Sequence, residues 1–133
     1  MKKVLFVCIE NARRSQMAEA LFKKLTKGQA VAVSAGDRPA SKVDPKAIEV
    51  MKEIGIDITK RRPKSLTMKM VTEADVVVTM GCGAEVCPVI PKRAEEWKIE
   101  DPAEKSTDKF REVRNEIKER VERLIKTLDN TGK

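Results

Sequence analysis

Apolar residues recur along the chain in two alternating patterns. Short apolar runs occupy residues 3–7, 30–36 and 74–83, and continuous runs of this kind are typical of parallel strands buried on both faces. Between the runs, apolar residues recur at steps of three and four, which is the period of an amphipathic helix. Strands that alternate with helices predict an α/β fold whose parallel strands are joined by right-handed crossovers.

Two helices have clear sequence signals at their ends. The first stops at Gly28 and carries an apolar face formed by Met17, Leu21 and Leu25. The second has Asp44 as its N-cap, Pro45 at its first position and Gly55 just past its end. These signals place one helix directly after each of the first two strands.

The second half of the chain is patterned less regularly. A basic loop around Pro63 leads to a short helix from about Leu66, and residues 95–101 predict a short fourth strand that ends at Asp101. A long final helix is predicted by apolar residues at helical spacing, namely Phe110, Val113, Ile117, Val121, Leu124 and Leu128. We expect residues 1–133 to form a single domain, because domains commonly run to about 100–150 residues.

The charge balance attracts anions but does not favour nucleic acid. The chain has 28 Lys and Arg against 21 Asp and Glu, which gives a net charge of +7. The basic and acidic residues are interspersed, however, and one Trp, three Phe and no Tyr leave few rings on which bases could stack. We therefore expect no nucleic-acid partner.

The N-terminal sequence MKKVLFVC imitates a secretion signal. Its apolar run ends at Glu10 and Asn11, whereas a signal peptide requires roughly 7–15 apolar residues, and no other segment reaches transmembrane length. We therefore expect a cytoplasmic protein with no membrane partner. Because cytoplasmic thiols are kept reduced, the three cysteines are not expected to form a structural disulfide framework.

The carboxyl ends of the predicted strands carry the candidate chemistry. Ligands of open parallel sheets bind beyond these ends, so Cys8, Cys82 and Asp101 are expected to share one rim. Cys8 also begins a C-x5-R-S spacing at a strand-to-helix turn. If the backbone N–H groups of this loop point inward, it forms an oxyanion cradle made of Cys8, Ile9, Glu10, Asn11, Ala12, Arg13, Arg14 and Ser15.

Several side chains of this loop suit covalent chemistry. Arg14 supplies a planar fork for two oxygens of a tetrahedral oxyanion. The helix end and the Ser15 hydroxyl favour a Cys8 thiolate, a nucleophile aimed at the central atom of the anion. The loop has no glycine, so Asn11 is expected at its left-handed position. A structural cysteine before a basic helix is the alternative, but these residue types at these offsets favour the functional interpretation.

The sequence VCIENARRSQMAEA resembles the signature loop of the low-molecular-weight protein tyrosine phosphatase superfamily, and RSQMAE resembles its arsenate reductase branch, which is coupled to thioredoxin. The similarity continues through VSAG, GIDI, ADVVVTM, the cysteine segment and DPA, and so covers nearly the whole chain. It implies a three-layer α/β/α fold of the phosphotyrosine protein phosphatase I type with a four-stranded parallel sheet. It also implies an arsenate or phosphate ligand and thioredoxin, or a similar thiol reductant, as partner.

Cys82 and Cys87 admit three interpretations. A structural zinc site would need a fourth ligand, and the chain has no His. Inert packing is disfavoured because the neighbouring glycines and Pro88 are typical of a loop. The resemblance implies a thiol relay instead, in which Cys8 attacks arsenate, Cys82 attacks Cys8 and releases arsenite, and Cys87 attacks Cys82 to leave a disulfide for the reductant.

Some relatives bind a potassium ion near this loop. Asn11, Glu19 and Ser34 match part of that pattern, but the sequence TKRRPK places Arg62 or Lys64 where further ligands would lie. We therefore predict no potassium or other metal site, and no cofactor.

The predicted catalytic set combines the loop, the relay cysteines and the carboxylate that matches the general acid of the superfamily: Cys8, Arg14, Ser15, Cys82, Cys87 and Asp101. Asp101 is nearly as compatible with a solvated carboxylate before a proline turn.

Our preferred interpretation is an arsenate reductase, possessing at most weak phosphatase activity. The nearest alternative is a phosphatase acting on phosphotyrosine or small phosphomonoesters. Two details count against it: a phosphatase does not require both Cys82 and Cys87, and no residue around Asp101 supplies the aromatic ring that usually follows the acid in those enzymes. A non-catalytic oxyanion or redox sensor is a third, for which the sequence offers no dedicated interaction segment.

Overall fold

A computed structural model describes residues 1–80 and 93–131 of the chain. Four parallel strands form one sheet in the order β2-β1-β3-β4, and this confirms the predicted sheet. The strands are β1 (Lys2–Cys8), β2 (Ala30–Gly36), β3 (Val76–Thr79) and β4 (Ala94–Glu96). β1 lies inside the sheet with β2 and β3 on its two sides, and the segment that follows β2 contacts the chain just past the end of β1.

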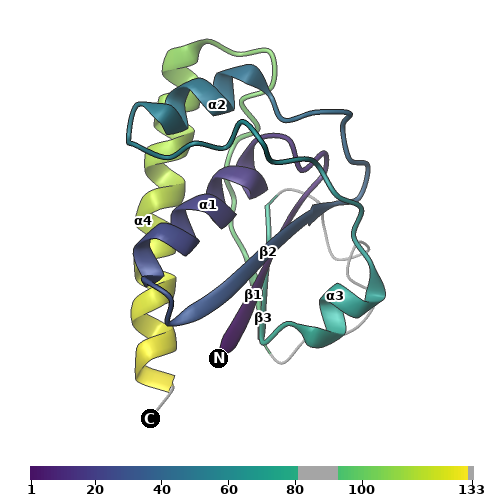
Figure 1. Ribbon diagram of the computed structural model, residues 1–133, viewed down its shortest axis with the longest axis vertical. Coiled ribbons are helices and arrows are strands. Elements are labelled where there is room, and N and C mark those ends of the chain that lie inside the picture. Colours follow the sequence, from purple (N-terminus) through teal and green to yellow (C-terminus); the bar gives the residue numbers. More distant parts are fainter. Residues whose placement is uncertain (81–92, 132–133) are drawn as a thin grey trace.

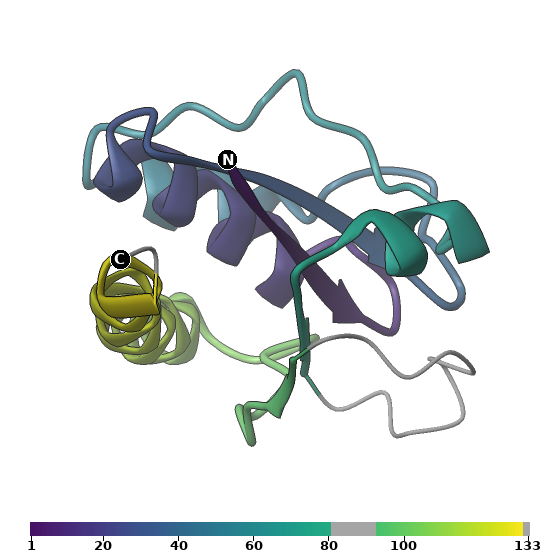
Figure 2. The ribbon, with the colours of Figure 1, turned by 90° about the horizontal axis from the view of Figure 1, so that it is seen from below.

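Helices cover both faces of the sheet, as Figures 1 and 2 show. On one face, α1 (Arg14–Thr26) and α2 (Pro45–Lys52) pack with the long helix α4 (Thr107–Thr131). On the other face lies the short helix α3 (Met68–Glu73). The three-layer α/β/α arrangement is therefore the one expected. Across residues 1–80 and 93–131, none of the helices has both the length and the apolar composition needed to cross a membrane.

Alternate residues of β1 enter two separate cores. Val4 and Phe6 join the cluster under α1 and α4, while Leu5 and Val7 join the cluster under α3. The Phe6 ring meets that of Phe22 edge to face, with 5.8 Å between the ring centroids. Burial on both faces explains why the strand is continuously apolar rather than alternating.

The predicted helix ends are confirmed at the first two helices. Asp44 caps α2, since its Oδ1 accepts a hydrogen bond from the backbone N–H of Lys46 at 2.9 Å, and Pro45 follows at the first helical position. Past the end of α1, Lys27 and Gly28 both have positive φ, 53° and 82°. The apolar face predicted for α4 is buried throughout, at Phe110, Val113, Ile117, Val121, Leu124 and Leu128.

Three boundaries differ from the predictions. The third strand spans only Val76–Thr79 of the predicted residues 74–83, and residues 81–83 lie outside the described part of the chain. The third helix begins at Met68 rather than near Leu66, because the Thr67 hydroxyl caps it by accepting from the N–H of Met70. The fourth strand ends at Glu96 rather than at Asp101. It can pair only along β3, which stops at Thr79, so the chain then leaves the sheet and crosses toward the loop after β1. Asp101 therefore lies in the loop between β4 and α4 and not at the end of a strand.

Candidate active site

Residues 9–13 form a tight loop between β1 and α1. Asn11 has φ 53°, so the left-handed position expected of it is confirmed. The end of β2 presses against the loop: a Cβ on Gly36 would lie 2.7 Å from the Ile9 carbonyl oxygen and 2.9 Å from the Asn11 nitrogen. Only a residue without a side chain allows this approach, which makes Gly36 part of the wall that shapes the loop.

The carbonyl groups of the loop point outward. Backbone N–H groups of the 37–44 segment donate to four of them, with N···O distances of 2.8–3.3 Å, at Cys8, Ile9, Glu10 and Ala12. In a trans peptide the N–H group points opposite to the carbonyl. The N–H groups that follow these carbonyls are therefore directed into the loop, as the cradle hypothesis requires.

The first turn of α1 closes the loop. Arg13 occupies the N-cap position and forms no side-chain capping hydrogen bond, so no side chain covers this helix end at its cap residue. The partial positive charge of a helix N-terminus consequently faces the loop. Cys8 lies beneath it and is 3% exposed.

Ser15 and Asn11 fix the polar surroundings of the Cys8 sulfur. The Ser15 Oγ lies 2.8 Å from Cys8 Sγ and accepts a hydrogen bond from Asn11 Nδ2 at 2.7 Å. Because Asn11 is the donor to that oxygen, the hydroxyl proton is free to point at the sulfur. Asn11 Oδ1 in turn accepts from Gln16 Nε2 and from the Lys64 N–H, both at 2.9 Å. The amide of Asn11 is thus held at both ends.

Arg14 is buried beside Cys8. Its Nη1 donates to the Ile99 carbonyl at 3.0 Å, and its Nη2 lies 3.6 Å from Asp101 Oδ2. Its Nε is buried and has no hydrogen-bond partner in the part of the chain that the structure describes. A buried donor without an acceptor costs about 1–3 kcal/mol, a cost that a bound oxyanion would remove.

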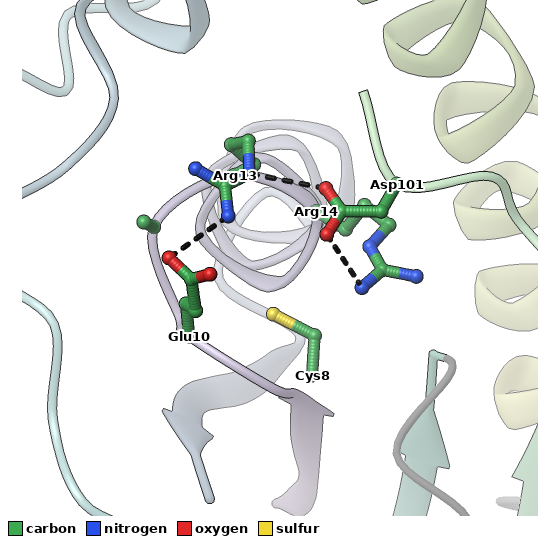
Figure 3. Close-up of a pocket in the computed structure, with 6 residues that line it drawn as sticks. Cys8, Glu10, Arg13, Arg14 and Asp101 are labelled. Atoms are coloured by element: carbon green, nitrogen blue, oxygen red, sulfur yellow. Dashed lines mark hydrogen bonds and ion pairs between the residues drawn. The ribbon is translucent and has the colours of Figure 1, made fainter. Parts of the chain in front are cut away.

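Arg13 joins three carboxylates at the mouth of the loop. Its nitrogens lie 3.0 Å from Glu10, 3.2 Å from Asp44 and 3.1 Å from Asp101. Burial lowers the pKa of Arg13, but the hydrogen bonds and charges of these carboxylates outweigh it and leave the pKa raised. Figure 3 shows Arg13 between Glu10 and Asp101, with the Cys8 sulfur directed into the loop.

One pocket contains most of the residues predicted from the first loop, together with Asp101. It is lined by Cys8, Glu10, Ala12, Arg13, Arg14 and Asp101. The expected meeting of Cys8 and Asp101 on one rim is thereby confirmed, whereas Cys82 and Cys87 lie outside the described residues. Sequence reasoning missed the link between Arg13, Asp44 and Asp101, for which the only signal was a second arginine beside Arg14.

A buried carboxylate lies behind the loop and is surrounded by cations. Glu19 accepts from Ser34 Oγ at 2.6 Å and pairs with Lys23 at 2.7 Å, Arg61 at 2.5 Å and Lys64 at 3.9 Å. Burial alone would raise the pKa of Glu19, but the bonds from Lys23, Ser34 and Arg61 outweigh it and lower the pKa. The sequence predicted that Arg62 or Lys64 would occupy the place of further potassium ligands. In the structure, Arg61 and Lys64 are the residues of this segment that pair with Glu19.

Arg62 takes a different position. Its carbonyl accepts a hydrogen bond from Gln16 Nε2 at 3.1 Å, and Glu19 is contacted from this segment by Arg61 and Lys64. Within residues 1–80 and 93–131, no three His, Cys, Asp or Glu side chains are grouped as ligands for a metal ion.

Known proteins resemble this chain over almost its whole length. The family model described as low molecular weight phosphotyrosine protein phosphatase matches residues 3–133. The chain belongs to this family. A similar protein, the glutaredoxin arsenate reductase of Synechocystis sp., is 43% identical over 128 residues, which cover 94% of this chain and 97% of the relative.

Solved structures of arsenate reductases superpose over almost the whole chain. An arsenate reductase in the phosphate-binding state has a TM-score of 0.85 and 41% identity, with coverage of 96% of this chain and 98% of the other. The thioredoxin-dependent arsenate reductase of Corynebacterium glutamicum also gives 0.85, at 36% identity, and covers 98% of this chain and 63% of its own. The resemblance to the arsenate reductase branch is therefore confirmed.

Proposed function

We propose that this chain is an arsenate reductase that binds arsenate in the loop of residues 8–15 and attacks it with Cys8. The observation that carries the proposal is the Arg14 Nε donor, buried without a partner among the described residues, in the pocket that contains Cys8. The inward N–H groups of the loop and the uncapped start of α1 add further donors for a tetrahedral anion. Support also comes from a similar arsenate reductase that was solved in a phosphate-binding state.

The first step forms a covalent adduct. The Cys8 thiolate attacks the arsenic atom of the dihydrogen arsenate anion, a sulfur–arsenic bond forms, and one oxygen leaves as water after taking a proton from Asp101. The arsenic of the adduct is still pentavalent, and Asp101 is left ionised. Ser15 donates to the sulfur before attack, and Arg14 holds two oxygens of the anion in its fork.

The second stage transfers two electrons. The Cys82 thiolate attacks Cys8 Sγ, a disulfide forms, and the pair of electrons of the sulfur–arsenic bond passes to arsenic, which leaves as arsenite. Cys87 then attacks Cys82, so that Cys8 is released as a thiolate and a disulfide joins Cys82 to Cys87. A thiol reductant must reopen this disulfide, and we accordingly place the protein in the cytoplasm, where thiols are kept reduced.

Phosphatase activity is the second candidate, because Cys8, Arg14 and Asp101 line one pocket and suffice for the hydrolysis of a phosphate ester. The two activities separate at Cys82, which only the reductase requires. In one preparation we would measure arsenite release and p-nitrophenyl phosphate hydrolysis, each with thioredoxin and its reductase, with glutaredoxin and glutathione, and without reductant.

We expect catalytic arsenite release only when a thiol reductant is present. Cys82→Ser should abolish it and spare any phosphatase activity, whereas Cys87→Ser should release one equivalent of arsenite and then stop. Cys8→Ser should lower both activities by at least about 1,000-fold and leave the fold intact, since a hydroxyl is a far weaker nucleophile than a thiolate. Full multiple turnover by both the Cys82 and the Cys87 variant would refute the relay and put the phosphatase first.

A further inference from the structure

The three nitrogens of the Arg13 guanidinium each contact a different carboxylate. Nη2 lies 3.0 Å from Glu10 Oε1, Nη1 lies 3.2 Å from Asp44 Oδ2, and Nε donates to Asp101 Oδ1 at 3.1 Å. These acids come from three separate parts of the chain: the loop itself, the N-cap of α2, and the segment after β4. Arg13 therefore ties the Asp101 segment to the loop that contains Cys8 (Figure 3).

Asp101 depends on such contacts because no strand or helix holds it. The chain leaves β4 at Glu96 and enters α4 only at Thr107. Asp101 Oδ1 accepts from Arg13 Nε and from the N–H of Ala103, both at 3.1 Å, whereas Oδ2 lies 3.6 Å from Arg14. Two donors therefore act on Oδ1, and Oδ2 is the oxygen left to carry a proton.

The position of Arg13 is itself fixed. Asp44 caps α2 with Oδ1 and contacts Arg13 with Oδ2, so a helix end anchors the guanidinium. The Arg13 side chain is only 11% exposed, and each of its nitrogens faces a carboxylate. Among the described residues, the Nε of Arg14 is a buried donor without a partner, whereas each guanidinium nitrogen of Arg13 already contacts a carboxylate.

From this we infer that Arg13 is a positioning residue for Asp101. Its guanidinium holds Oδ1 so that a proton on Oδ2 faces the oxygen that leaves the oxyanion, and this guanidinium does not itself bind the oxyanion. The inference rests on the proposed function, in which Asp101 supplies that proton. Arg13 thus affects proton transfer through Asp101 and not substrate affinity.

Kinetic coupling between Arg13 and Asp101 provides the first test. Arg13→Met keeps the aliphatic stem and removes all three guanidinium nitrogens with their N–H donors. In single-turnover arsenite release we expect it to be about 10-fold slower than wild type, with the inhibition constant of phosphate changed less than about 2-fold. In an Asp101→Asn background the same substitution should cost less than about 2-fold, because the group that it positions is already unable to donate a proton.

Two variants control for stability. Asp44→Asn keeps the α2 cap and removes one anchoring charge, so it should slow turnover less than Arg13→Met does. Arg111→Met removes an arginine that pairs with Glu53 and Asp108 far along the chain; it should leave turnover unchanged even if the melting temperature falls. Equal slowing by Arg111→Met would overturn the inference.

Amide exchange tests the positioning without activity. The N–H of Ala103 bonds to Asp101, and the N–H of Thr59 bonds to Asp57 in a matching turn at 2.9 Å. By NMR, Arg13→Met should speed exchange at Ala103 several-fold and leave Thr59 unchanged. Unaltered exchange at Ala103 refutes the inference whatever Asp101 does in catalysis.

The remaining outcomes distinguish the proposed role of Asp101 as the acid from the inferred role of Arg13 in positioning it. If Asp101→Asn is fully active, the proposed acid fails, while the exchange result still decides whether Arg13 positions that side chain. If Asp101→Asn is slow and Arg13→Met is not, the inference alone is wrong. The inference is also wrong if Arg13→Met weakens phosphate inhibition 10-fold or more, since the Arg13 guanidinium would then be an anion ligand. It is wrong as well if Arg13→Met slows single turnover by the same factor in the wild type and in Asp101→Asn.

Discussion

Asn11 shows how a single residue can organise the loop that we propose to be catalytic. Its positive φ turns the backbone without a glycine, and its amide donates to Ser15 while accepting from Gln16 and Lys64. The same side chain thereby sets the loop conformation and leaves the Ser15 hydroxyl proton free to point at the Cys8 sulfur. At this scale the loop is held by a small number of defined hydrogen bonds, three of which involve Asn11.

Arg14→Lys tests the requirement for a guanidinium at the oxyanion. An ammonium group cannot donate to Ile99 and also offer a planar fork, so we expect kcat/KM for arsenate to fall by about 100- to 1,000-fold. The inhibition constant of phosphate should rise as well. Arg111→Lys, outside the pocket, is the matched control and should retain full activity; a loss below about 10-fold in Arg14→Lys would contradict the assigned role.

At the scale of elements, the end of β2 and the 37–44 segment support the loop from outside. Backbone N–H groups of the segment donate to the loop carbonyls, and Gly36 lets the strand end touch Ile9 and Asn11. The shape of the loop is therefore determined by packing against a second strand and not only by its own eight residues.

Gly36→Ala should distort the loop, because the new Cβ would lie 2.7 Å from a backbone oxygen that cannot rotate away. We expect a loss of about 1–3 kcal/mol in the free energy of unfolding and a fall of about 10-fold or more in kcat/KM. Gly28→Ala is the control. It places a side chain at φ +82° in open space, so it should cost about 1 kcal/mol without lowering activity. Equal activity in the two variants would show that the close approach of Gly36 does not shape the loop after β1.

At the scale of the whole molecule, Glu19 joins three parts of the fold behind the site. It lies on α1 and contacts Ser34 on β2 and Arg61 and Lys64 on the segment that leads to α3. Burial lowers the pKa of Lys64, and the charge of Glu19 opposes that effect. One carboxylate among several cations therefore contributes to stability in a pH-dependent way.

Stability should fall in acid through Glu19. Its pKa in the folded protein lies below the ordinary value of 4.5, so its contribution is complete above that pH and is lost as the pH falls through the lower, folded value. Glu19→Gln should cost about 3 kcal/mol at pH 7 and should flatten the decline of stability below pH 4.5 in urea denaturation. If the free energy of unfolding falls equally steeply below pH 4.5 in this variant and in the wild type, other carboxylates cause the acid destabilisation.

The same cluster predicts no specific effect of potassium. Because Arg61 and Lys64 already neutralise Glu19, a monovalent cation gains little there. The melting temperature should be equal in potassium and sodium chloride at the same ionic strength, both for wild type and for the Glu19→Gln control. A rise in potassium that the Glu19 substitution abolishes would disprove this.

The sequence by itself determined the elements and most of the first loop. Apolar runs and helix caps depend on neighbouring residues, so β2, the α2 cap at Asp44 and the face of α4 were predictable. The spacing from Cys8 to Ser15 lies within one turn, and its local geometry follows from residue types. The resemblance to a family extended this information to the fold as a whole.

Only the tertiary structure decided how distant residues meet. The end of β4 depends on where β3 stops, and the contacts of Arg13 with Asp44 and Asp101 join positions 31 and 88 residues apart. Likewise, the choice of Arg61 and Lys64 at Glu19 depends on the path of a loop across α1. Sequence patterns report local periodicity and capping, whereas these contacts arise from the packing of separate elements, which no local pattern encodes.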